Sequence, residues 1–203
     1  MASTERHATR TAATFAAVAA VAALCFALIA SSSAQDASAL GADCGPHVDA
    51  VPGEATAREM RKAVRCLINE ERAARDRRRV RSNRALTQIA QAHTKVMVAD
   101  DCFTHQCPGE RPLRKRIESS AYLAQGGRYG YGENLGCSKT PQGMVNEWMA
   151  TSFHRENILD RRFRHVGVGA KRGSPFPRGS EDCMPGRRYM TYTVIFAWRK
   201  LKR

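Results

Sequence analysis

The stretch Trp148-Met-Ala-Thr-Ser-Phe-His-Arg-Glu-Asn-Ile-Leu159, with Phe163 and Val166-Gly-Val-Gly169 behind it, decides how this chain folds. Trp148 and Met149 end a helix-forming segment, and a histidine follows six residues after the tryptophan. Val166–Gly169 alternates apolar residues with glycine, as a strand does where another backbone approaches closely. Two upstream segments, Phe103-Thr-His105 and Gly132-Glu-Asn-Leu135, are its expected partners. Together these pieces would bring two histidines and one glutamate into one cleft.

Three helices and one strand are expected elsewhere in the chain. Thr56-Ala-Arg-Glu59 is a capping box, and the apolar stripe after it predicts a helix to about Asp76. A second helix is expected from near Asn83, and a short basic helix with Pro112 near its first turn. Arg188 to Arg199 alternates with apolar residues on both faces, which predicts a strand covered on both sides. The predicted architecture is therefore a set of helices around a small, mainly antiparallel sheet.

The joints between these elements are also visible in the sequence. The arginine-rich stretch after the first helix is expected to be a loop. Gly126-Gly127, Gly130 and Gly132 are expected to break the chain before Glu133. Thr140-Pro141 then opens the helix that carries Trp148, with the threonine as N-cap and the proline at the first helical position.

The N-terminus has the pattern of a secretory signal. Arg6 and Arg10 precede an apolar run from Thr11 to Ala30, and Ser31-Ser-Ser-Ala34 supplies the small residues of a cleavage site. This pattern predicts a secreted, extracellular protein. The apolar run approaches the about 20 residues that span a bilayer, so an uncleaved membrane anchor is the alternative.

The rest of the chain has the composition of one globular domain. The 203 residues are 43% hydrophobic and 26% charged, and they show no internal repeat, so one core of ordinary size is expected. The predicted division is a signal peptide over 1–34, an N-terminal arm over 35–55 and a folded domain over 56–203.

Six cysteines follow the predicted leader. In an exported chain they predict three disulfides. Cys102 and Cys107 are close enough to close the Phe-Thr-His loop, and Cys137 and Cys183 are candidates to tie the cleft to the sheet. Cys44 and Cys66 are then left to join the arm to the first helix. A zinc knuckle is the alternative, but the chain contains no Cys-x-x-Cys pair.

The chain is strongly basic, with a formal net charge of +14. Seven arginines lie between residues 72 and 84, and further basic clusters occupy 111–116, 161–164 and 199–203. Such a surface would adhere to lipid phosphates, to anionic cell-envelope polymers or to nucleic acid. The simpler interpretation is a solvated face. No specific nucleic acid is predicted as a partner, because no aromatic residues alternate with the arginines to stack on bases.

Read in order, the motifs resemble those of the CAP superfamily (cysteine-rich secretory protein, antigen 5 and pathogenesis-related 1), in its compact bacterial SCP-like extracellular branch. The resemblance covers roughly Val64 to Trp198. Its motifs are Asn69-Glu-Glu-Arg72, Phe103-Thr-His105, Gly132-Glu-Asn134, Trp148 to Leu159, Val166 to Gly169 and Tyr192-Thr-Val-Ile-Phe196. The fold that the resemblance implies is α+β: a three-layer α-β-α sandwich with a small, mainly antiparallel sheet.

The resemblance also implies a cleft lined by two histidines and two acidic residues. Three of these carry over, as His105, Glu133 and His154. The second acid lies three residues after the tryptophan in longer eukaryotic members, and here that position is Thr151. The residues expected to support the cleft are Asn134, Thr151 and Asn157.

Two imidazoles and a carboxylate suit a zinc-like divalent metal with an open position for water, which such a metal could activate for hydrolysis. Alternatively, Glu133 hydrogen-bonds one histidine and braces the cleft. The expected cleft lacks a second carboxylate for acid–base catalysis and a free cysteine. The sequence also lacks the His-Glu-x-x-His and Gly-x-Ser-x-Gly motifs.

The expected function is therefore a secreted, non-enzymatic binding module for lipid or cell-envelope ligands that requires no cofactor. The alternative is a metal-dependent hydrolase of peptide, cell-wall or nucleic-acid substrates that uses His105, Glu133 and His154. An inert structural or adhesive domain is a third interpretation.

Overall fold

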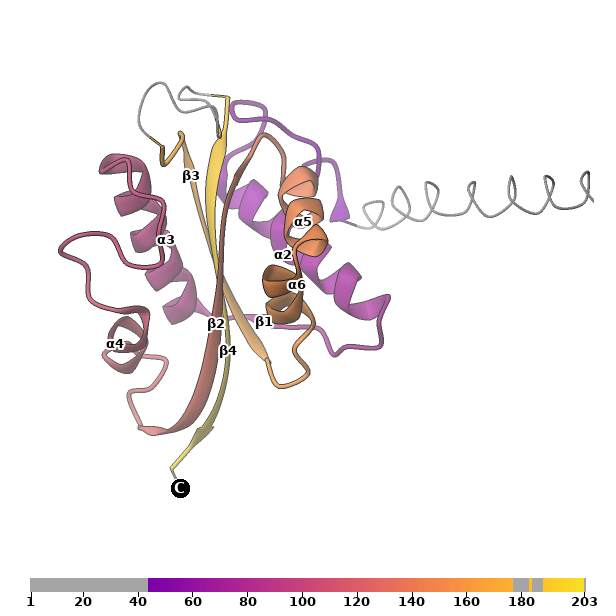
Figure 1. Ribbon diagram of the computed structural model, residues 1–203. Helices are drawn as coiled ribbons and strands as arrows, with labels where there is room; N and C mark the ends of the chain where they lie inside the picture. Colours follow the sequence, from indigo (N-terminus) through magenta and orange to yellow (C-terminus); the bar gives the residue numbers. More distant parts are fainter. Residues whose placement is uncertain (1–43, 177–182, 184–187, 203) are drawn as a thin grey trace, which may run out of the picture. The chain divides into compact units, whose positions relative to one another are not determined.

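The computed structural model describes residues 44–176, 183 and 188–202, and Figure 1 shows their arrangement. The predicted signal peptide and the first part of the predicted arm lie outside the described residues. Nine helices and strands are described: α2 (Ala57–Ala73), β1 (Arg81–Ser82), α3 (Arg84–Ala99), α4 (Leu113–Glu118), β2 (Gly127–Ser138), α5 (Pro141–Ala150), α6 (Ser152–Leu159), β3 (His165–Arg172) and β4 (Met190–Leu201).

These elements form three layers, as predicted. The four strands lie in the order β1-β3-β4-β2, and all neighbours are antiparallel except the short β1, which runs parallel to β3. Helices α3 and α4 cover one face of the sheet, and α2, α5 and α6 cover the other (Figure 1). The α-β-α sandwich is thereby confirmed. In the described part of the chain, no helix is both long and apolar enough to cross a membrane.

Strand β4 is buried on both faces, which confirms the alternation read from its sequence. Tyr192 and Phe196 pack with Trp148 in the core under α2, α5 and α6. Ile195 faces the other way and packs with Leu86 of α3 in a second, smaller core. Each large apolar side chain buried in this way contributes about 1.5–3 kcal/mol. The central strand therefore joins the two cores.

The predicted helix starts are confirmed by their caps. Thr56 and Glu59 form both hydrogen bonds of the capping box at the start of α2. The side chains of Asn83 and Thr140 accept from backbone N–H groups in the first turns of α3 and α5. Helix α2 ends at Ala73, short of the predicted Asp76, whose φ of 55° is left-handed.

The expected break before Glu133 is wrong, because Gly127–Ser138 is one continuous strand paired with β4 along its whole length. Its glycines mark close packing. A Cβ at Gly132 would lie 2.3 Å from the side-chain oxygen of Asn157, and one at Gly136 would lie 2.3 Å from Met144. Glycine at these two positions lets α5 and α6 approach the sheet edge.

The motif Asn69-Glu-Glu-Arg72 ties α2 to the rest of the core. Asn69 exchanges two hydrogen bonds with the backbone of Val80. Arg72 is fully buried, and its guanidinium donates to the carbonyls of Arg78, Ile158 and Asp160 at 2.7, 2.5 and 3.1 Å. One buried arginine therefore holds the end of α6 against α2.

All three expected disulfides are present: Cys44–Cys66, Cys102–Cys107 and Cys137–Cys183.

Candidate ligand-binding cleft

Polar and apolar side chains meet in a cleft of about 820 Å³ beside β2. One wall is the loop after α3, which carries Phe103 and His105. The second is the end of β2 from Leu135 to Ser138. The third is the junction of α5 and α6, where Thr151 and His154 lie. The cleft is thus built from the segments that the sequence indicated.

His105 and Glu133 form the polar contact at this cleft. Nδ1 of His105 lies 2.8 Å from Oε2 of Glu133. The glutamate side chain is 2% exposed in the middle of β2, whereas the histidine side chain is 65% exposed. The hydrogen bond to Glu133 raises the pKa of His105, and partial burial opposes that shift. Because Nδ1 is engaged, Nε2 is the ring nitrogen left for a ligand.

Two asparagines hold this part of β2 against α6. Asn134 donates its side-chain amide to the carbonyl of His154 at 3.0 Å. Asn157 donates to the side-chain oxygen of Asn134 at 2.9 Å and also approaches the carbonyl of Glu133 at 3.3 Å. Thr151 lines the cleft directly and joins α5 to α6.

His154 lies on the cleft wall but does not join the His105–Glu133 pair. Partial burial lowers its pKa, and the positive charge of nearby His105 lowers it further. In the described part of the chain, two groups of three side chains bring their ligand atoms within 4.8 Å of one another, and His154 belongs to neither group. The structure therefore brings two of the three predicted residues together, and the three side chains as placed do not fit a single metal ion.

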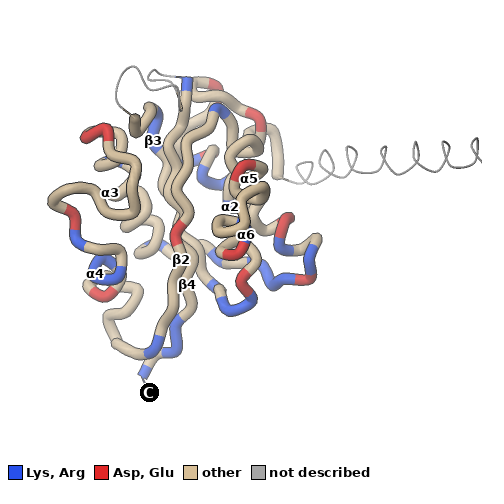
Figure 2. Tube along the Cα trace, viewed as in Figure 1, with Lys and Arg blue, Asp and Glu red and all other residues tan. Residues whose placement is uncertain are grey.

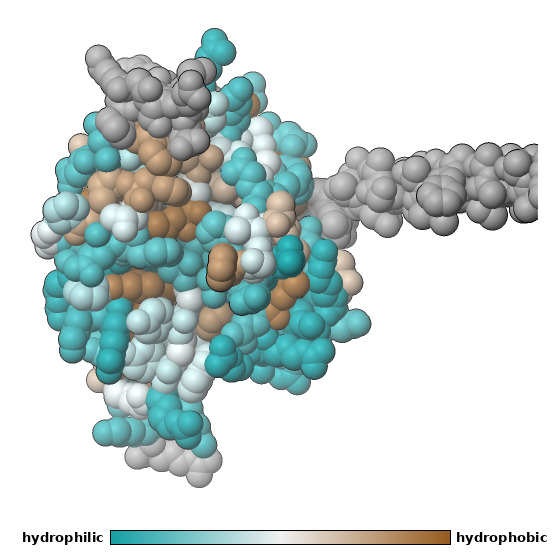
Figure 3. Space-filling model, in the orientation of Figure 1, coloured by the Kyte–Doolittle hydropathy of each residue, from teal (hydrophilic) through white to brown (hydrophobic). Residues whose placement is uncertain are grey.

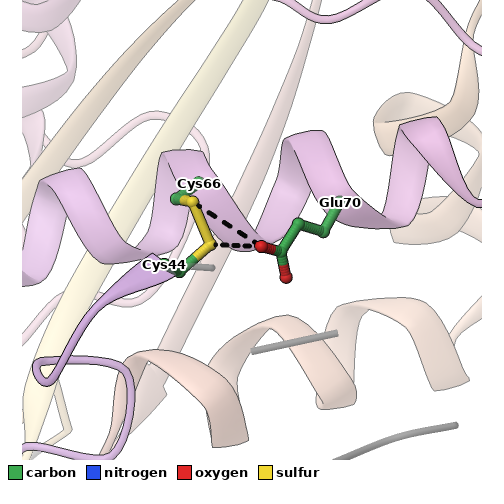
Figure 4. A group of neighbouring side chains, drawn as sticks. All are labelled: Cys44, Cys66 and Glu70. Atoms are coloured by element: carbon green, nitrogen blue, oxygen red, sulfur yellow. Dashed lines mark hydrogen bonds between the residues drawn. A yellow bond between two sulfur atoms is a disulfide. The ribbon is translucent and has the colours of Figure 1, made fainter. Parts of the chain in front are cut away.

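The two groups that do converge are not metal sites either. They are Cys44, Cys66 and Glu70, and His93, Cys107 and Glu110. Figure 4 shows the first, with Glu70 Oε1 2.9 Å from the sulfur of Cys44. All three cysteines of these groups are in disulfides, so they offer no thiolate to a metal and no proton to a carboxylate. No cofactor is established by these groups.

A buried polar network supports the loop of His105. The sequence indicated that His93 is an interior histidine with a polar partner, but it did not indicate Glu110 and Arg116. Nδ1 of the fully buried His93 lies 2.7 Å from Glu110. Arg116 lies between two carboxylates, 3.8 Å from Glu110 and 4.0 Å from Glu133, and donates to the carbonyl of His105 at 2.8 Å. The loop is therefore fixed by ionic contacts to α3, α4 and β2.

Glu147 gives the cleft a second carboxylate, so the expectation of a single carboxylate is wrong. It lies immediately before Trp148, not three residues after it. Burial raises its pKa, and the hydroxyl of Ser138 at 3.3 Å partly offsets this. Helical spacing could have found it, because Glu147 precedes Thr151 by four residues and therefore shares a helix face with it.

Aromatic side chains give the cleft an apolar rim. Phe103 is 39% exposed, and its ring centroid lies 4.8 Å from that of Phe176, which also lines the cleft. Phe153, next to His154, is 78% exposed and lies outside the set of residues that line the cleft. Figure 3 shows apolar surface in brown within the mostly hydrophilic face. A polar His105 thus sits beside apolar surface.

Comparison with known proteins supports the resemblance read from the motifs. Residues 66–183 match a family model described as CAP, the cysteine-rich secretory protein family. An uncharacterised protein of Bacillus subtilis strain 168, YkwD, is 31% identical over 110 residues. That match covers 53% of this chain and 41% of YkwD, so the chain spans about two fifths of its relative.

Two solved structures share the fold. An extracellular protein with an SCP domain from Bacillus anthracis has a TM-score of 0.52 at 21% identity, over 73% of this chain and 45% of that one. An outer surface protein from Borrelia burgdorferi has a TM-score of 0.58 at 16% identity, over 72% and 97%. With the family model covering more than half of its residues, and this fold around its cleft, the chain belongs to the CAP, or cysteine-rich secretory protein, family.

Proposed function

We propose that this protein is a secreted binding module whose cleft holds an amphiphilic lipid. The observation that carries the proposal is the juxtaposition of an exposed imidazole, held by buried Glu133, with a wall of aromatic and aliphatic side chains. His105 would bind the polar head group through Nε2, and Phe103, Leu135 and Phe176 would contact the apolar part.

The size and setting of the cleft support this proposal. Its volume of about 820 Å³ falls in the range of about 300–1,000 Å³ that is usual for small-molecule sites. Secretion is supported by three disulfides, which persist in oxidising compartments, and by the signal-like N-terminus.

The hydrolase alternative has weaker support. A metal-dependent hydrolase needs its ligands on one ion, and His154 stands apart from the His105–Glu133 pair. Glu133 instead occupies the position of a carboxylate that orients a histidine. Zinc titration of the wild type, His105→Ala and His154→Ala distinguishes the two. Stoichiometric binding lost in both variants, together with hydrolytic activity lost in step, would favour the hydrolase.

Lipid binding is tested by filling the cleft. Thr151 is exposed and lines the cleft, so Thr151→Trp should obstruct it without disturbing a core. Asn146→Trp places the same side chain on an exposed part of α5 outside the cleft, and serves as the control. With a fluorescent long-chain fatty acid as probe, we expect affinity to fall about tenfold or more for Thr151→Trp, and less than about twofold for Asn146→Trp.

The head-group contact is tested separately with His105→Ala. This variant should lose affinity for the fatty acid but keep its affinity for an uncharged apolar probe. The proposal is wrong if the wild type binds neither probe above a protein of matched charge, or if Thr151→Trp binds as well as Asn146→Trp.

A further inference from the structure

A second groove, of about 870 Å³, lies near the edge of the sheet away from the cleft. Ser82 of β1 lines it, and β1 and β2 are the two outer strands of the sheet. Its other lining residues come from α2 and α3, including Arg58, Arg61 and Arg84. The cleft and this groove are therefore separated by the width of the sheet.

The groove is lined by cations without carboxylates. Arg58, Arg61, Arg84 and Lys95 line it, and among the residues that the structure describes no aspartate or glutamate does. Within the described residues, none of the ion pairs involves these four side chains. Basic residues occur over much of the molecule, as Figure 2 shows. Elsewhere several are paired, such as Arg162 with Asp160 at 2.6 Å.

Two of these cations lie in the first turn of a helix, where the helix dipole disfavours a positive charge. Arg84 is the first residue of α3 and Arg58 the second of α2, and a positive charge in a first helical turn opposes the helix dipole. The first turn of α3 contains no acidic residue to compensate. The first turn of α2 already contains Glu59, so a bound anion would be favoured by the cations and by the N-terminus of α3.

Arg61 is held in place for such a contact. It donates to the side-chain oxygen of Gln91 at 2.7 Å, and Gln91 donates to the carbonyl of Ala170 in β3 at 3.0 Å. Burial and the neighbouring charge of Arg58 both lower the pKa of Arg61. A partly buried guanidinium beside another cation is destabilised, and an anion between the two would relieve this.

The side chains around these cations indicate which kind of anion fits. Guanidinium groups match the geometry of phosphate, and Ser82, Thr87 and Gln88 add neutral hydrogen-bonding groups. None of the described residues that line the groove is aromatic, so these residues offer no ring to stack on a nucleobase. Several cations along one groove suit repeated phosphates better than a single anion.

We propose that the groove between α2, β1 and α3 binds a linear phosphodiester polymer without bases, and so anchors the protein while the cleft stays open. This proposal is independent of the lipid-binding function. It assigns a role to four of the chain's basic side chains, Arg58, Arg61, Arg84 and Lys95.

The test compares two variants that lose the same charge. Arg58→Gln/Arg84→Gln removes two exposed charges from the groove. Arg128→Gln/Lys200→Gln removes two exposed charges that face each other across β2 and β4. With poly(glycerol phosphate) as probe, we expect affinity to fall about tenfold or more for the groove variant and less than about twofold for the control. The slope of log affinity against log salt should decrease in the groove variant only.

Three outcomes would overturn the proposal. Equal losses in the two double variants would show that net charge alone attracts the polymer. No loss in either variant would show that the groove does not bind it. Tighter binding of single-stranded DNA than of poly(glycerol phosphate) would show that the groove prefers a nucleic acid to a polymer without bases. The fluorescent fatty acid should bind the groove variant as it binds the wild type, so the two proposals can fail separately.

Discussion

At the scale of single residues, the pKa values of the two cleft histidines are expected to be shifted in opposite directions. The hydrogen bond to Glu133 raises the pKa of His105, whereas burial and the charge of His105 lower that of His154. We expect NMR titration of the ring protons to show Glu133→Gln lowering the pKa of His105, and His105→Ala raising that of His154. His165, whose pKa is lowered by burial and by Arg199, is the internal control and should not change.

The sign of the effect on stability follows from these directions. The pKa of His105 is higher in the folded state, so its pair with Glu133 stabilises the fold at pH values below the unfolded pKa. This contribution is lost as the pH rises through the folded pKa. His154 behaves in the opposite way, because protonation of a partly buried histidine destabilises the fold as the pH falls through its lowered pKa. An unchanged pKa of His105 in Glu133→Gln, or of His154 in His105→Ala, would contradict this account.

Arg72 offers a second residue-scale prediction. Replacing it by methionine would leave three carbonyls without their donor: the buried carbonyl of Ile158 and the partly buried carbonyls of Arg78 and Asp160. An unpaired buried acceptor costs about 1–3 kcal/mol and a partly buried one costs less, so Arg72→Met should lower the free energy of unfolding by about 2 kcal/mol or more. Urea denaturation measures this.

The control is Arg79→Met, in the same arginine-rich stretch but exposed, which should change stability by about 0.5 kcal/mol or less. If Arg72→Met changes the free energy of unfolding as little as Arg79→Met does, water replaces the Arg72 guanidinium as the donor to these carbonyls.

What the sequence predicts at this scale depends on how far apart the contacts lie. The capping threonines and asparagine act on their own helices, so a few residues were enough to predict them. Glu110 and Arg116 were missed because their partners lie on other elements, and no local spacing marks them. Motif order did place His105 beside Glu133, but it gave no distance for His154.

At the scale of elements, glycines decide how closely helices approach the sheet. A Cβ at Gly167 of β3 would lie 2.2 Å from the carbonyl carbon of Leu86 and 2.4 Å from the backbone nitrogen of Thr87. Since these are backbone atoms, Gly167→Ala must displace α3, at a cost of about 2 kcal/mol or more. We also expect lower hydrogen-exchange protection throughout α3.

Gly109→Ala is the control for Gly167→Ala, because it introduces backbone strain without a close contact to α3. Its Cβ would meet nothing within 4 Å in the part of the chain that the structure describes, but its φ of 79° disfavours alanine by about 1–2 kcal/mol. This variant should leave the protection of α3 unchanged. If both variants reduce that protection equally, the close approach at Gly167 is not what fixes α3.

The same glycines explain which elements the sequence did not predict. Gly130 and Gly132 suggested interruptions, but in β2 they mark places where Trp198 and Asn157 pack against the strand, as Met144 does at Gly136. A lone sequence does not distinguish a glycine needed for a turn from one needed for contact. Helix α6 was likewise not predicted as a separate helix. Periodic apolar faces, in contrast, predicted α2, α3, β3 and β4.

At the scale of the whole molecule, the sheet separates two surfaces of different chemistry. The cleft beside β2 combines apolar walls with His105, and the groove beside β1 is cationic. The core formed by Trp148, Phe196 and their neighbours holds these edges rigidly with respect to each other. A ligand at one surface therefore need not displace a ligand at the other.

The disulfides allow stability and binding to be separated at this scale. Cys44–Cys66 closes a loop of 22 residues far along the chain from the cleft segments, whereas Cys102–Cys107 closes 5 residues around Phe103 and His105. Loop-closure entropy predicts a loss of about 3 kcal/mol in the free energy of unfolding for the first disulfide and about 2 kcal/mol for the second when both partners become serine.

The loss of fatty-acid affinity should be larger for the second disulfide, because only the shorter loop carries cleft residues. Fatty-acid affinity should therefore fall for Cys102→Ser/Cys107→Ser and stay near wild type for Cys44→Ser/Cys66→Ser, measured at a temperature where thermal denaturation shows both variants folded. If affinity instead falls in proportion to stability in both variants, the loop is not specifically required and the cleft depends only on the overall fold.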